Sequence, residues 1–303
     1  MKYIVTGGAG FIGSNLVDKL VLNDHEVHIL DNFSTGKKKN CNSKASYHEL
    51  DICNLKNSKK ITKIMSNADS VFHMAALARV QPSILNPLKY ELHNTIGTMN
   101  ILKSSVDAGV KRVVYSASSS AYGNPIELPS IECHPTNPIS PYAAQKYYGE
   151  VCCKMFSEVY NIETVSLRYF NVYGEKQNLG GAYATVVGIF VKQCLDGDKM
   201  TINGDGTNRR DYTYVGDVVK ANLLASESHN VGNGEVINIG SGINLSVNDV
   251  AKLIGKNKVY RDPVKEPKET LADISKAKSL LNWSPEVRLE DWIIGYKKKI
   301  GLK

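Results

Sequence analysis

The first half of the chain alternates short apolar runs with longer amphipathic stretches. The short runs, rich in valine, isoleucine and aromatic residues, indicate buried strands, and the longer stretches have the three-and-four spacing of helices. We expect strands at 2–7, 26–31, 45–51, 70–76, 111–118 and 163–171, and helices at 12–23, 90–109 and 142–161. Because strands that alternate with helices form parallel units, this pattern predicts an α/β fold with a doubly wound parallel sheet.

The pattern changes after Asn171. The stretches 174–184 and 203–215 are rich in glycine, asparagine and charged residues, which indicates loops that face a ligand. The last part of the chain mixes short strands with helices, and these helices are expected at 246–255, 273–283 and 289–300. Ligands of doubly wound sheets bind at the carboxyl ends of the strands. We therefore expect a smaller C-terminal lobe over that edge of the sheet.

Composition narrows the class of protein. The 303 residues carry a formal net charge of +7, which is modest for this length and indicates a solvated basic surface rather than a nucleic-acid partner. Because an expected strand begins at residue 2, we expect no secretory leader, and no stretch approaches the roughly 20 apolar residues that cross a bilayer. The six cysteines have no metal-ligand spacing. We expect a cytoplasmic location, free thiols, no membrane partner and no metal.

The segment "TGGAGFIGS" joins the first expected strand to the first expected helix. Gly7, Gly10 and Gly13 have the G-x-x-G-x-x-G spacing that allows a tight turn, close approach of a pyrophosphate and close packing of helix on strand. Free N–H groups at the start of the helix attract the phosphates. Asp31 ends the second strand, where a carboxylate accepts a hydrogen bond from a ribose 2′-hydroxyl and repels a 2′-phosphate. These features predict a Rossmann-like site for NAD rather than NADP.

Tyr142 and Lys146 stand four residues apart at the start of an expected helix, so both side chains project from one face. An ammonium beside a phenol favours the phenolate and lowers its pKa from about 10 toward that of a useful general base. Taken alone, the pair is equally compatible with two surface residues. The preceding strand, however, ends in the hydroxyl-rich run "SASSSAYG" at 116–123. Hydroxyls and a base at one edge of the sheet indicate a catalytic site.

The chain resembles the extended short-chain dehydrogenase/reductases of the NAD-dependent sugar epimerase/dehydratase family, and is most like their UDP-glucose and UDP-N-acetylglucosamine 4-epimerases. The matching segments span almost the whole chain: "TGGAGFIGS", "DNFSTGK", "HMAALARV", "SASSSAYG", "SPYAAQK", "LRYFNVYG", "RRDYTYVGDV" and "LADISKA". The resemblance implies tightly held NAD. It also implies an NAD-binding Rossmann domain at 1–170, to which segments at about 212–240 return, and a mainly substrate-binding lobe at 171–303.

The resemblance further implies roles for individual residues. Ser118 matches the family's catalytic hydroxyl, Tyr142 its general acid/base, and Lys146 its ribose-binding lysine. Cofactor contacts are implied for Gly7, Gly10, Phe11, Ile12, Gly13, Asp31, Asn32, Ser34, Thr35, Gly36, Asp51, Ile52, Ala75, Ala76, Asn94, Ser116, Tyr142, Lys146 and Tyr169. Substrate contacts are implied for Ser118, Ser119, Ser120, Tyr142, Asn171, Arg210 and Thr270.

Three positions bear on how the substrate is held. Arg210 matches the arginine that pairs with the substrate diphosphate, for which bidentate guanidinium contacts are suited. Thr270 stands where relatives restricted to glucose and galactose have a tyrosine, and a small residue there admits a 2-acetamido group. Pro263 replaces an arginine found in many relatives, and the candidates to compensate are Arg261 and Lys265.

The lack of an acidic side chain at the hydroxyl-rich strand end indicates the type of reaction. The family's dehydratases and decarboxylases carry an acid in the hydroxyl-rich strand end, but residues 116–123 contain no Asp or Glu. This favours oxidation and re-reduction at C4 without elimination, in a UDP-hexose 4-epimerase that interconverts UDP-N-acetylglucosamine and UDP-N-acetylgalactosamine, UDP-glucose and UDP-galactose, or both pairs.

Three alternatives stay open. They are a UDP-glucuronate 4-epimerase or decarboxylase, a reductase with dissociable NADPH, and a non-catalytic NAD-sensing binding protein. A carboxylate-bearing substrate requires an additional cationic or hydroxyl-rich pocket, which the sequence does not locate. Helices 89–108 and 142–160 carry apolar residues on more than one face. The additional stripe is either core or a two-fold helix-bundle interface, and we expect a homodimer.

Overall fold

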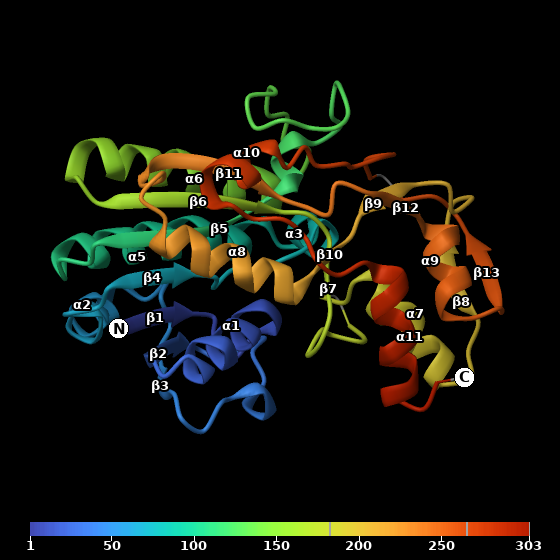
Figure 1. Cartoon of the computed structure of the whole chain (residues 1–303), viewed down its shortest axis with the longest axis horizontal. Helices are drawn as coiled ribbons and strands as arrows, with labels where there is room; N and C mark the ends of the chain where they lie inside the picture. Colours follow the sequence, from blue (N-terminus) through green and yellow to red (C-terminus); the bar gives the residue numbers. More distant parts are fainter. Residues whose placement is uncertain (182, 265, 303) are drawn as a thin grey trace.

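Seven parallel strands form the central sheet of the protein, for which a computed structural model describes residues 1–181, 183–264 and 266–302. Figure 1 shows the sheet with helices on both faces. The strands, in the order in which they lie side by side, are β11 (Asn233–Ile239), β6 (Glu163–Tyr169), β5 (Arg112–Ser118), β4 (Ser70–His73), β1 (Lys2–Thr6), β2 (Glu26–Asp31) and β3 (Ser46–Glu49). The chain builds from β1 outward to β3 and then from β4 outward to β11, so the order reverses beside β1, as in dinucleotide-binding sheets. The expected Rossmann-like α/β fold is confirmed.

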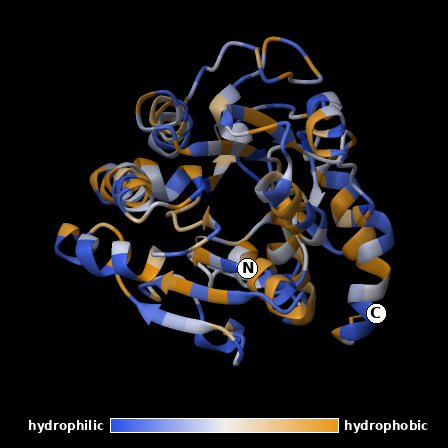
Figure 2. Cartoon of the chain, turned by 60° about the vertical axis from the view of Figure 1, so that its left-hand side comes forward, coloured by the Kyte–Doolittle hydropathy of each residue, from blue (hydrophilic) through white to orange (hydrophobic). Residues whose placement is uncertain are grey.

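Apolar stripes on the helices pack against the two faces of this sheet. One face is covered by α1 (Phe11–Leu22), α8 (Val215–Glu227) and α10 (Ser275–Leu281), and the other by α2 (Ser58–Met65), α5 (Gly97–Asp107) and α6 (Pro141–Tyr160). Figure 2 shows hydrophobic residues alternating with hydrophilic ones along the helices, as expected for helices that turn one apolar side toward a sheet. The helix expected at 90–109 is formed by α4 (Pro87–Glu91), a π-helical turn (Leu92–Ile96) and α5 in succession.

A smaller lobe lies beyond the carboxyl ends of the strands, at the right of Figure 1. Its helices are α7 (Val186–Leu195), α9 (Val247–Ile254) and α11 (Leu289–Lys299), which share an apolar core. Three separate two-stranded sheets accompany these helices: β8 (Met200–Asn203) with β13 (Lys258–Arg261), β9 (Arg209–Asp211) with β12 (Asn244–Ser246), and β7 (Val172–Tyr173) with β10 (Thr213–Tyr214). The stretch 203–215, expected as a loop, therefore contains two of these short strands.

Two later segments return to the large sheet. Strand β11 pairs in parallel with β6, and α8 packs on α1. Helix α10 packs on α8 and β11, although the sequence pattern places it in the smaller lobe. The reason is that Leu281 and Trp283 are buried in the sheet's core, where the Trp283 indole donates to the Asp217 carbonyl oxygen over 2.9 Å. The assignment of NAD binding to residues 1–170 and of substrate binding mainly to residues 171–303 stays a prediction.

The helices α2, α7 and α8 were not expected from the sequence, and neither was a short helix that borders the carboxyl edge of the sheet. Helix α3 (Val80–Leu85) follows β4 directly and packs against α6. No helix of the described ranges has both the length and the apolar character needed to cross a bilayer.

Gly149 lies where α6 packs on β5. A Cβ at this position would meet the Tyr115 hydroxyl at 2.2 Å, and Tyr115 is itself fully buried. We expect Gly149→Ala to lower the free energy of unfolding by about 1–3 kcal/mol, because the core must shift to admit a methyl group. Gly295→Ala, on α11 with open space around it, is the control and should gain up to about 1 kcal/mol. Urea unfolding measures both, and unchanged stability of Gly149→Ala would contradict this packing.

Candidate active site

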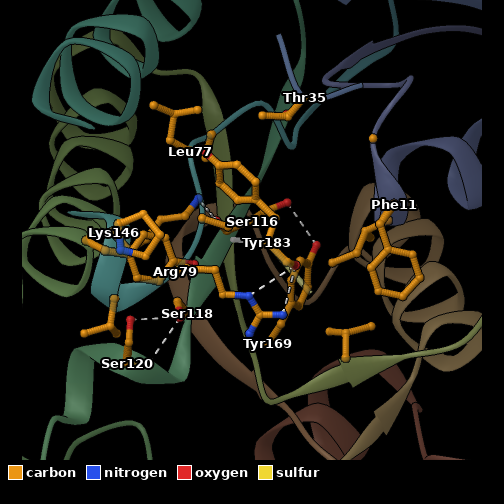
Figure 3. A pocket seen from close by; sticks show the side chains of 18 of the residues that line it. Phe11, Thr35, Leu77, Arg79, Ser116, Ser118, Ser120, Lys146, Tyr169 and Tyr183 are labelled. Carbon is orange, nitrogen blue, oxygen red and sulfur yellow. Dashed lines mark hydrogen bonds between the residues drawn. The ribbon is translucent and has the colours of Figure 1, made fainter. Parts of the chain in front are cut away.

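A cavity of about 630 Å³ lies along the carboxyl ends of the strands. Its wall is formed by residues of the large sheet and by loops of the smaller lobe, so a ligand in it would touch both. Figure 3 shows the part of the cavity near the ends of β5 and β6, with side chains from several elements pointing inward. This placement agrees with the general position of ligands in doubly wound sheets.

The glycine turn at the start of α1 requires residues without side chains. Gly7 has a φ of 69°, and a Cβ on it would meet the Ala75 backbone at 2.8 Å. A Cβ on Gly13 would lie 2.3 Å from the Gly7 carbonyl oxygen. The turn therefore packs tightly against the segment that follows β4, and its residues Gly7, Gly10 and Gly13 line the cavity at the start of α1, where a pyrophosphate binds in folds of this kind.

Asp31 lies at the end of β2 in the cavity wall. Its two carboxylate oxygens accept hydrogen bonds from the backbone N–H groups of Ala9 and Phe33, over 2.9 and 2.8 Å. The carboxylate is therefore held in place by the glycine turn itself. Because each carboxylate oxygen accepts more than one hydrogen bond, Asp31 retains capacity for a ribose hydroxyl.

Most residues with predicted cofactor contacts line this cavity: Gly7, Gly10, Phe11, Ile12, Gly13, Asp31, Asn32, Ser34, Thr35, Asp51, Ile52, Ala75, Ala76, Ser116, Tyr142, Lys146 and Tyr169. Gly36 and Asn94 are not in the wall. Gly36 packs against the Asp31 carboxylate, and Asn94 exchanges hydrogen bonds with the backbone of Leu77, which does line the cavity. These two residues support the wall, and all the cofactor contacts stay predictions.

Ser118 is the last residue of β5 and lines the cavity together with Tyr142. Its hydroxyl oxygen accepts hydrogen bonds from the Ser120 backbone N–H (3.2 Å) and the Ser120 hydroxyl (2.9 Å). The Ser118 proton is therefore left to donate toward the Tyr142 oxygen. The structure thus brings together the three residues in an order that suits transfer of a proton between Tyr142 and a ligand hydroxyl.

Burial opposes ionisation of the Tyr142 phenol and raises its pKa above the usual value. The Ser118 hydrogen bond and the positive charge of Arg79 act in the opposite direction. A phenol that is desolvated, hydrogen-bonded and close to a cation has the features of a general acid/base whose charge depends on its ligand.

Lys146 lies in the second turn of α6, and its ammonium donates to the Ser116 carbonyl oxygen over 2.6 Å. The ammonium also lies 4.8 Å from the centre of the Tyr115 ring. Burial lowers the pKa of Lys146 to about 8. The amine therefore loses its proton before Tyr142 does, and in the ligand-free protein Arg79 is the cation that favours the phenolate. This differs from the expectation based on the Tyr142 and Lys146 spacing alone.

The residues with predicted substrate contacts, Ser119, Ser120, Asn171, Arg210 and Thr270, also line the cavity together with Ser118 and Tyr142. The Arg210 guanidinium is held by Glu266, whose carboxylate lies 2.9 Å away, and by the carbonyl oxygens of Arg209 and Lys268. A diphosphate would therefore meet a guanidinium that is already oriented. Arg261 lies on β13 outside the wall, and Lys265 is outside the described residues.

The residues of the wall that the sequence did not single out include Arg79, Asn178 and Tyr183. Asn178 and Tyr183 belong to the stretch 174–184, whose glycine-rich composition indicates a ligand-facing loop, but no pattern selects them individually. Arg79 follows β4 in the segment "HMAALARV". Its position just past the carboxyl end of a strand was the available signal.

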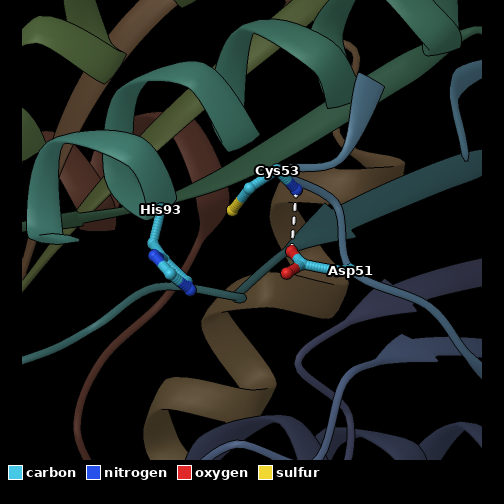
Figure 4. A group of neighbouring side chains, drawn as sticks. All are labelled: Asp51, Cys53 and His93. Carbon is cyan, nitrogen blue, oxygen red and sulfur yellow. Dashed lines mark hydrogen bonds between the residues drawn. The ribbon is translucent and has the colours of Figure 1, made fainter. Parts of the chain in front are cut away.

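A possible metal cluster lies at another part of the cavity, where single ligand atoms of Asp51, Cys53 and His93 are all within 4.8 Å of one another (Figure 4). The Asp51 carboxylate already accepts from the Cys53 backbone N–H over 2.9 Å. Burial, followed by the nearby Asp51 charge, raises the pKa of the Cys53 thiol far above its usual value. A thiol that stays protonated is a poor metal ligand, so the chemistry of this group does not suit a metal.

Comparison with known proteins agrees with the fold and the cavity. A family model described as the NAD dependent epimerase/dehydratase family matches residues 3–240. A putative UDP-glucose 4-epimerase of Methanocaldococcus jannaschii is 42% identical over 298 residues, which cover 96% of this chain and 95% of that protein. The crystal structure of a Thermotoga maritima UDP-glucose 4-epimerase with UDP-glucose has a TM-score of 0.94 at 39% identity and covers 99% of each chain.

A third similar protein was solved with a cofactor. The Bacillus cereus UDP-glucuronic acid 4-epimerase in complex with UDP-glucuronic acid and NAD has a TM-score of 0.89 at 34% identity, covering 99% of this chain and 100% of that chain. The family model spans more than half of the sequence, and the similar proteins extend over nearly all of it. The chain therefore belongs to the NAD-dependent epimerase/dehydratase family.

Proposed function

We propose that the protein is a UDP-hexose 4-epimerase that uses bound NAD to interconvert UDP-N-acetylglucosamine and UDP-N-acetylgalactosamine, UDP-glucose and UDP-galactose, or both pairs. The observation that carries the proposal is that Ser118, Tyr142 and Lys146 line one part of the cavity that also contains the glycine turn. The relatives and neighbours named as 4-epimerases support the same reaction type.

The distribution of acids in the cavity favours epimerisation over elimination. The acidic residues of the described wall are Asp31, Asp51 and Glu266. Asp31 and Asp51 follow β2 and β3, which lie on the far side of β1 from β5, and Glu266 is paired with Arg210. None of the three stands in the strand end that carries Ser118. An acid is therefore lacking where abstraction of a proton from a neighbouring sugar carbon would require it.

The proposed steps use the residues of the strand and the helix. NAD, when bound, supplies an acceptor and donor of hydride at the sugar's C4. Tyr142, as phenolate, accepts the proton of the C4 hydroxyl, and Ser118 bridges the two oxygens. Arg210 and Asn171 hold the diphosphate, so the oxidised sugar can turn and present its other face. Tyr142 then returns the proton to the hydroxyl of inverted configuration.

Thr270 supports turnover of acetylated sugars. It lies in the cavity wall, and its hydroxyl accepts a long hydrogen bond of 3.4 Å from the backbone N–H of Asp211 on β9. A threonine occupies less of the cavity than the tyrosine of relatives restricted to plain hexoses. The room that remains is the basis for the proposed acceptance of a 2-acetamido group.

We also propose a homodimer formed through the helices beside β5 and β6. Leu88 on α4 is 83% exposed, and Val151 and Val159 on α6 are 50% and 63% exposed. Apolar side chains on adjacent helices that are left in solvent favour association. The two-fold helix bundle expected from the sequence would bury them.

Tyr142→Phe removes the hydroxyl that accepts the proton. We expect kcat to fall by about 10²–10⁴-fold, the typical contribution of a general base, with bound NAD retained. The wild-type kcat/KM should rise with pH, because burial favours the protonated phenol, and this rise should be absent in the variant. Tyr160→Phe, at the exposed end of the same helix, serves as the control. Steady-state assays over a pH range measure both effects. Wild-type activity in Tyr142→Phe would show that Tyr142 is not the general base.

Thr270→Tyr narrows the cavity at the proposed acetamido wall. We expect kcat/KM for UDP-N-acetylglucosamine to fall by at least about 10-fold relative to UDP-glucose, because the added ring overpacks that part of the site. Thr270→Ser keeps a small residue and should keep both activities. Equal losses on the two sugars, or no turnover of acetylated sugars by the wild type, would refute this role of Thr270.

Val151→Asp places a charge in the proposed dimer interface. We expect light scattering to show a particle of single-chain mass, because burial of an unpaired carboxylate is costly. Leu22→Asp, at the exposed end of α1 on the other face of the sheet, is the matched control and should stay dimeric. A wild-type protein of single-chain mass at micromolar concentration would contradict the proposal.

A further inference from the structure

Arg79 has an unusual position at the edge of the sheet. It follows β4 and begins α3, with backbone angles of φ 86° and ψ 139°. This region is rarely adopted by residues other than glycine, and strained residues that persist in folded proteins gather at functional sites. The conformation turns the side chain into the cavity, as Figure 3 shows.

The guanidinium of Arg79 has no acidic partner among the described residues. Its Nε and Nη2 atoms donate to the Tyr183 carbonyl oxygen over 3.4 and 3.3 Å, which are long hydrogen bonds. The other buried or half-buried arginines of the described residues are paired: Arg112 with Glu163, Arg168 with Glu150, Arg209 with Asp249 and Arg210 with Glu266. Arg79 is thus an exception within its own fold.

An enclosed charge without a counterion is costly, and folded proteins pair such charges or leave them for a ligand. Burial is deep enough here to lower the pKa of the Arg79 guanidinium. The guanidinium donors that the Tyr183 carbonyl does not use suit a planar anion, because a guanidinium matches a carboxylate with two parallel hydrogen bonds. The cavity therefore offers a site for an anionic group.

The neighbours of Arg79 indicate which part of the ligand carries this anion. Two phenols, those of Tyr142 and Tyr90, lie close enough to Arg79 that their negative charge would raise the pKa of its guanidinium. Tyr142 is the proposed proton acceptor at the sugar's C4, whereas the cofactor phosphates are expected at the Gly7–Gly13 turn and the substrate diphosphate at Arg210. An anion beside Tyr142 is therefore a substituent of the sugar, and the carbon next to C4 that carries an exocyclic carboxylate in some hexoses is C5.

We propose that Arg79 binds a carboxylate on C5 of the sugar, so that UDP-hexuronates are substrates as well and are preferred to the neutral sugars named above. This rests on the proposed 4-epimerase function and extends its range of substrates to the uronates. It supplies the cationic pocket that the sequence alone did not locate. The role is independent of Thr270, which concerns the substituent at C2, so an acetamido group and a carboxylate are compatible in one substrate.

The test uses the NAD-containing enzyme and four substrates that combine the two substituents: UDP-glucose, UDP-N-acetylglucosamine, UDP-glucuronate and UDP-N-acetylglucosaminuronate. We expect the wild type to have higher kcat/KM on both uronates than on their neutral counterparts. Arg79→Gln should lower kcat/KM on the uronates by about 10- to 100-fold, mainly through KM, because a charge-assisted contact is lost. The neutral sugars should lose clearly less, and only in kcat, because Arg79 also favours the Tyr142 phenolate, and that loss should shrink as the pH rises. Arg79→Lys should be intermediate.

Two further variants keep the test decisive. Arg79→Gly, which adopts a φ of 86° without strain, ensures a folded protein and should show the same selective loss. Arg288→Gln removes an exposed arginine outside this cavity and should behave as the wild type. NAD content is measured for each protein by release and absorbance.

The outcomes that would overturn the role of Arg79 differ from the outcome that would refute the epimerase function. Equal losses on all four sugars, or loss of NAD from Arg79→Gln, would assign Arg79 to Tyr142 or to the cofactor phosphates and overturn the proposal. Higher turnover of neutral sugars than of uronates by the wild type would overturn it as well, while the epimerase function would stand. Absence of turnover on every UDP-sugar would instead refute the proposed function.

Discussion

The hydrogen bond from the Lys146 ammonium to the Ser116 carbonyl oxygen, 2.6 Å long, joins the start of α6 to the end of β5. Side chains repeat every second residue on one face of a strand and about every fourth residue on one face of a helix. Once Lys146 is fixed beside Ser116, Tyr142 one turn earlier must lie beside Ser118 two residues later. A single buried contact therefore sets the position of the acid/base pair, and Gly149 allows the helix to come this close.

The same burial controls the charges of the site. Desolvation lowers the pKa of Lys146 to about 8 and raises that of Tyr142. Arg79 keeps its proton over this range, because a guanidinium is not deprotonated under such conditions. The cavity thus carries positive charge that its own described carboxylates do not neutralise near Tyr142. An anionic ligand bound there would offset this positive charge. Binding of the substrate and ionisation of Tyr142 are therefore linked.

Local patterns in the sequence suffice to predict the strands of the first half and its longer helices, since each has a clear apolar period. They miss α2 and α3, which are too short to show one. They also predict most of the cavity wall, because the ends of parallel strands meet at one edge. The position of α10 does not follow from its pattern, since an amphipathic helix does not show which core receives it. The burial of Trp283 decides that.

Arg79 is a second limit of prediction from sequence. A single arginine after a strand has no period and no partner in sequence, and only the folded chain shows that no acid reaches it. The order in which Lys146 and Tyr142 lose their protons is equally invisible in the Y-x-x-x-K spacing. It depends on how deeply each side chain is enclosed, and therefore on packing rather than on sequence distance.

The central claim is that Tyr142 and Ser118 remove the hydroxyl proton at C4 while the hydrogen on that carbon moves to the bound cofactor and back. A UDP-hexose or UDP-hexuronate labelled with deuterium at C4 tests this most directly, with the products analysed by NMR in ordinary water. The account predicts that the epimer formed retains its deuterium at C4. Replacement of the label by hydrogen from solvent would contradict it, because the carbon-bound hydrogen would then have left as a proton.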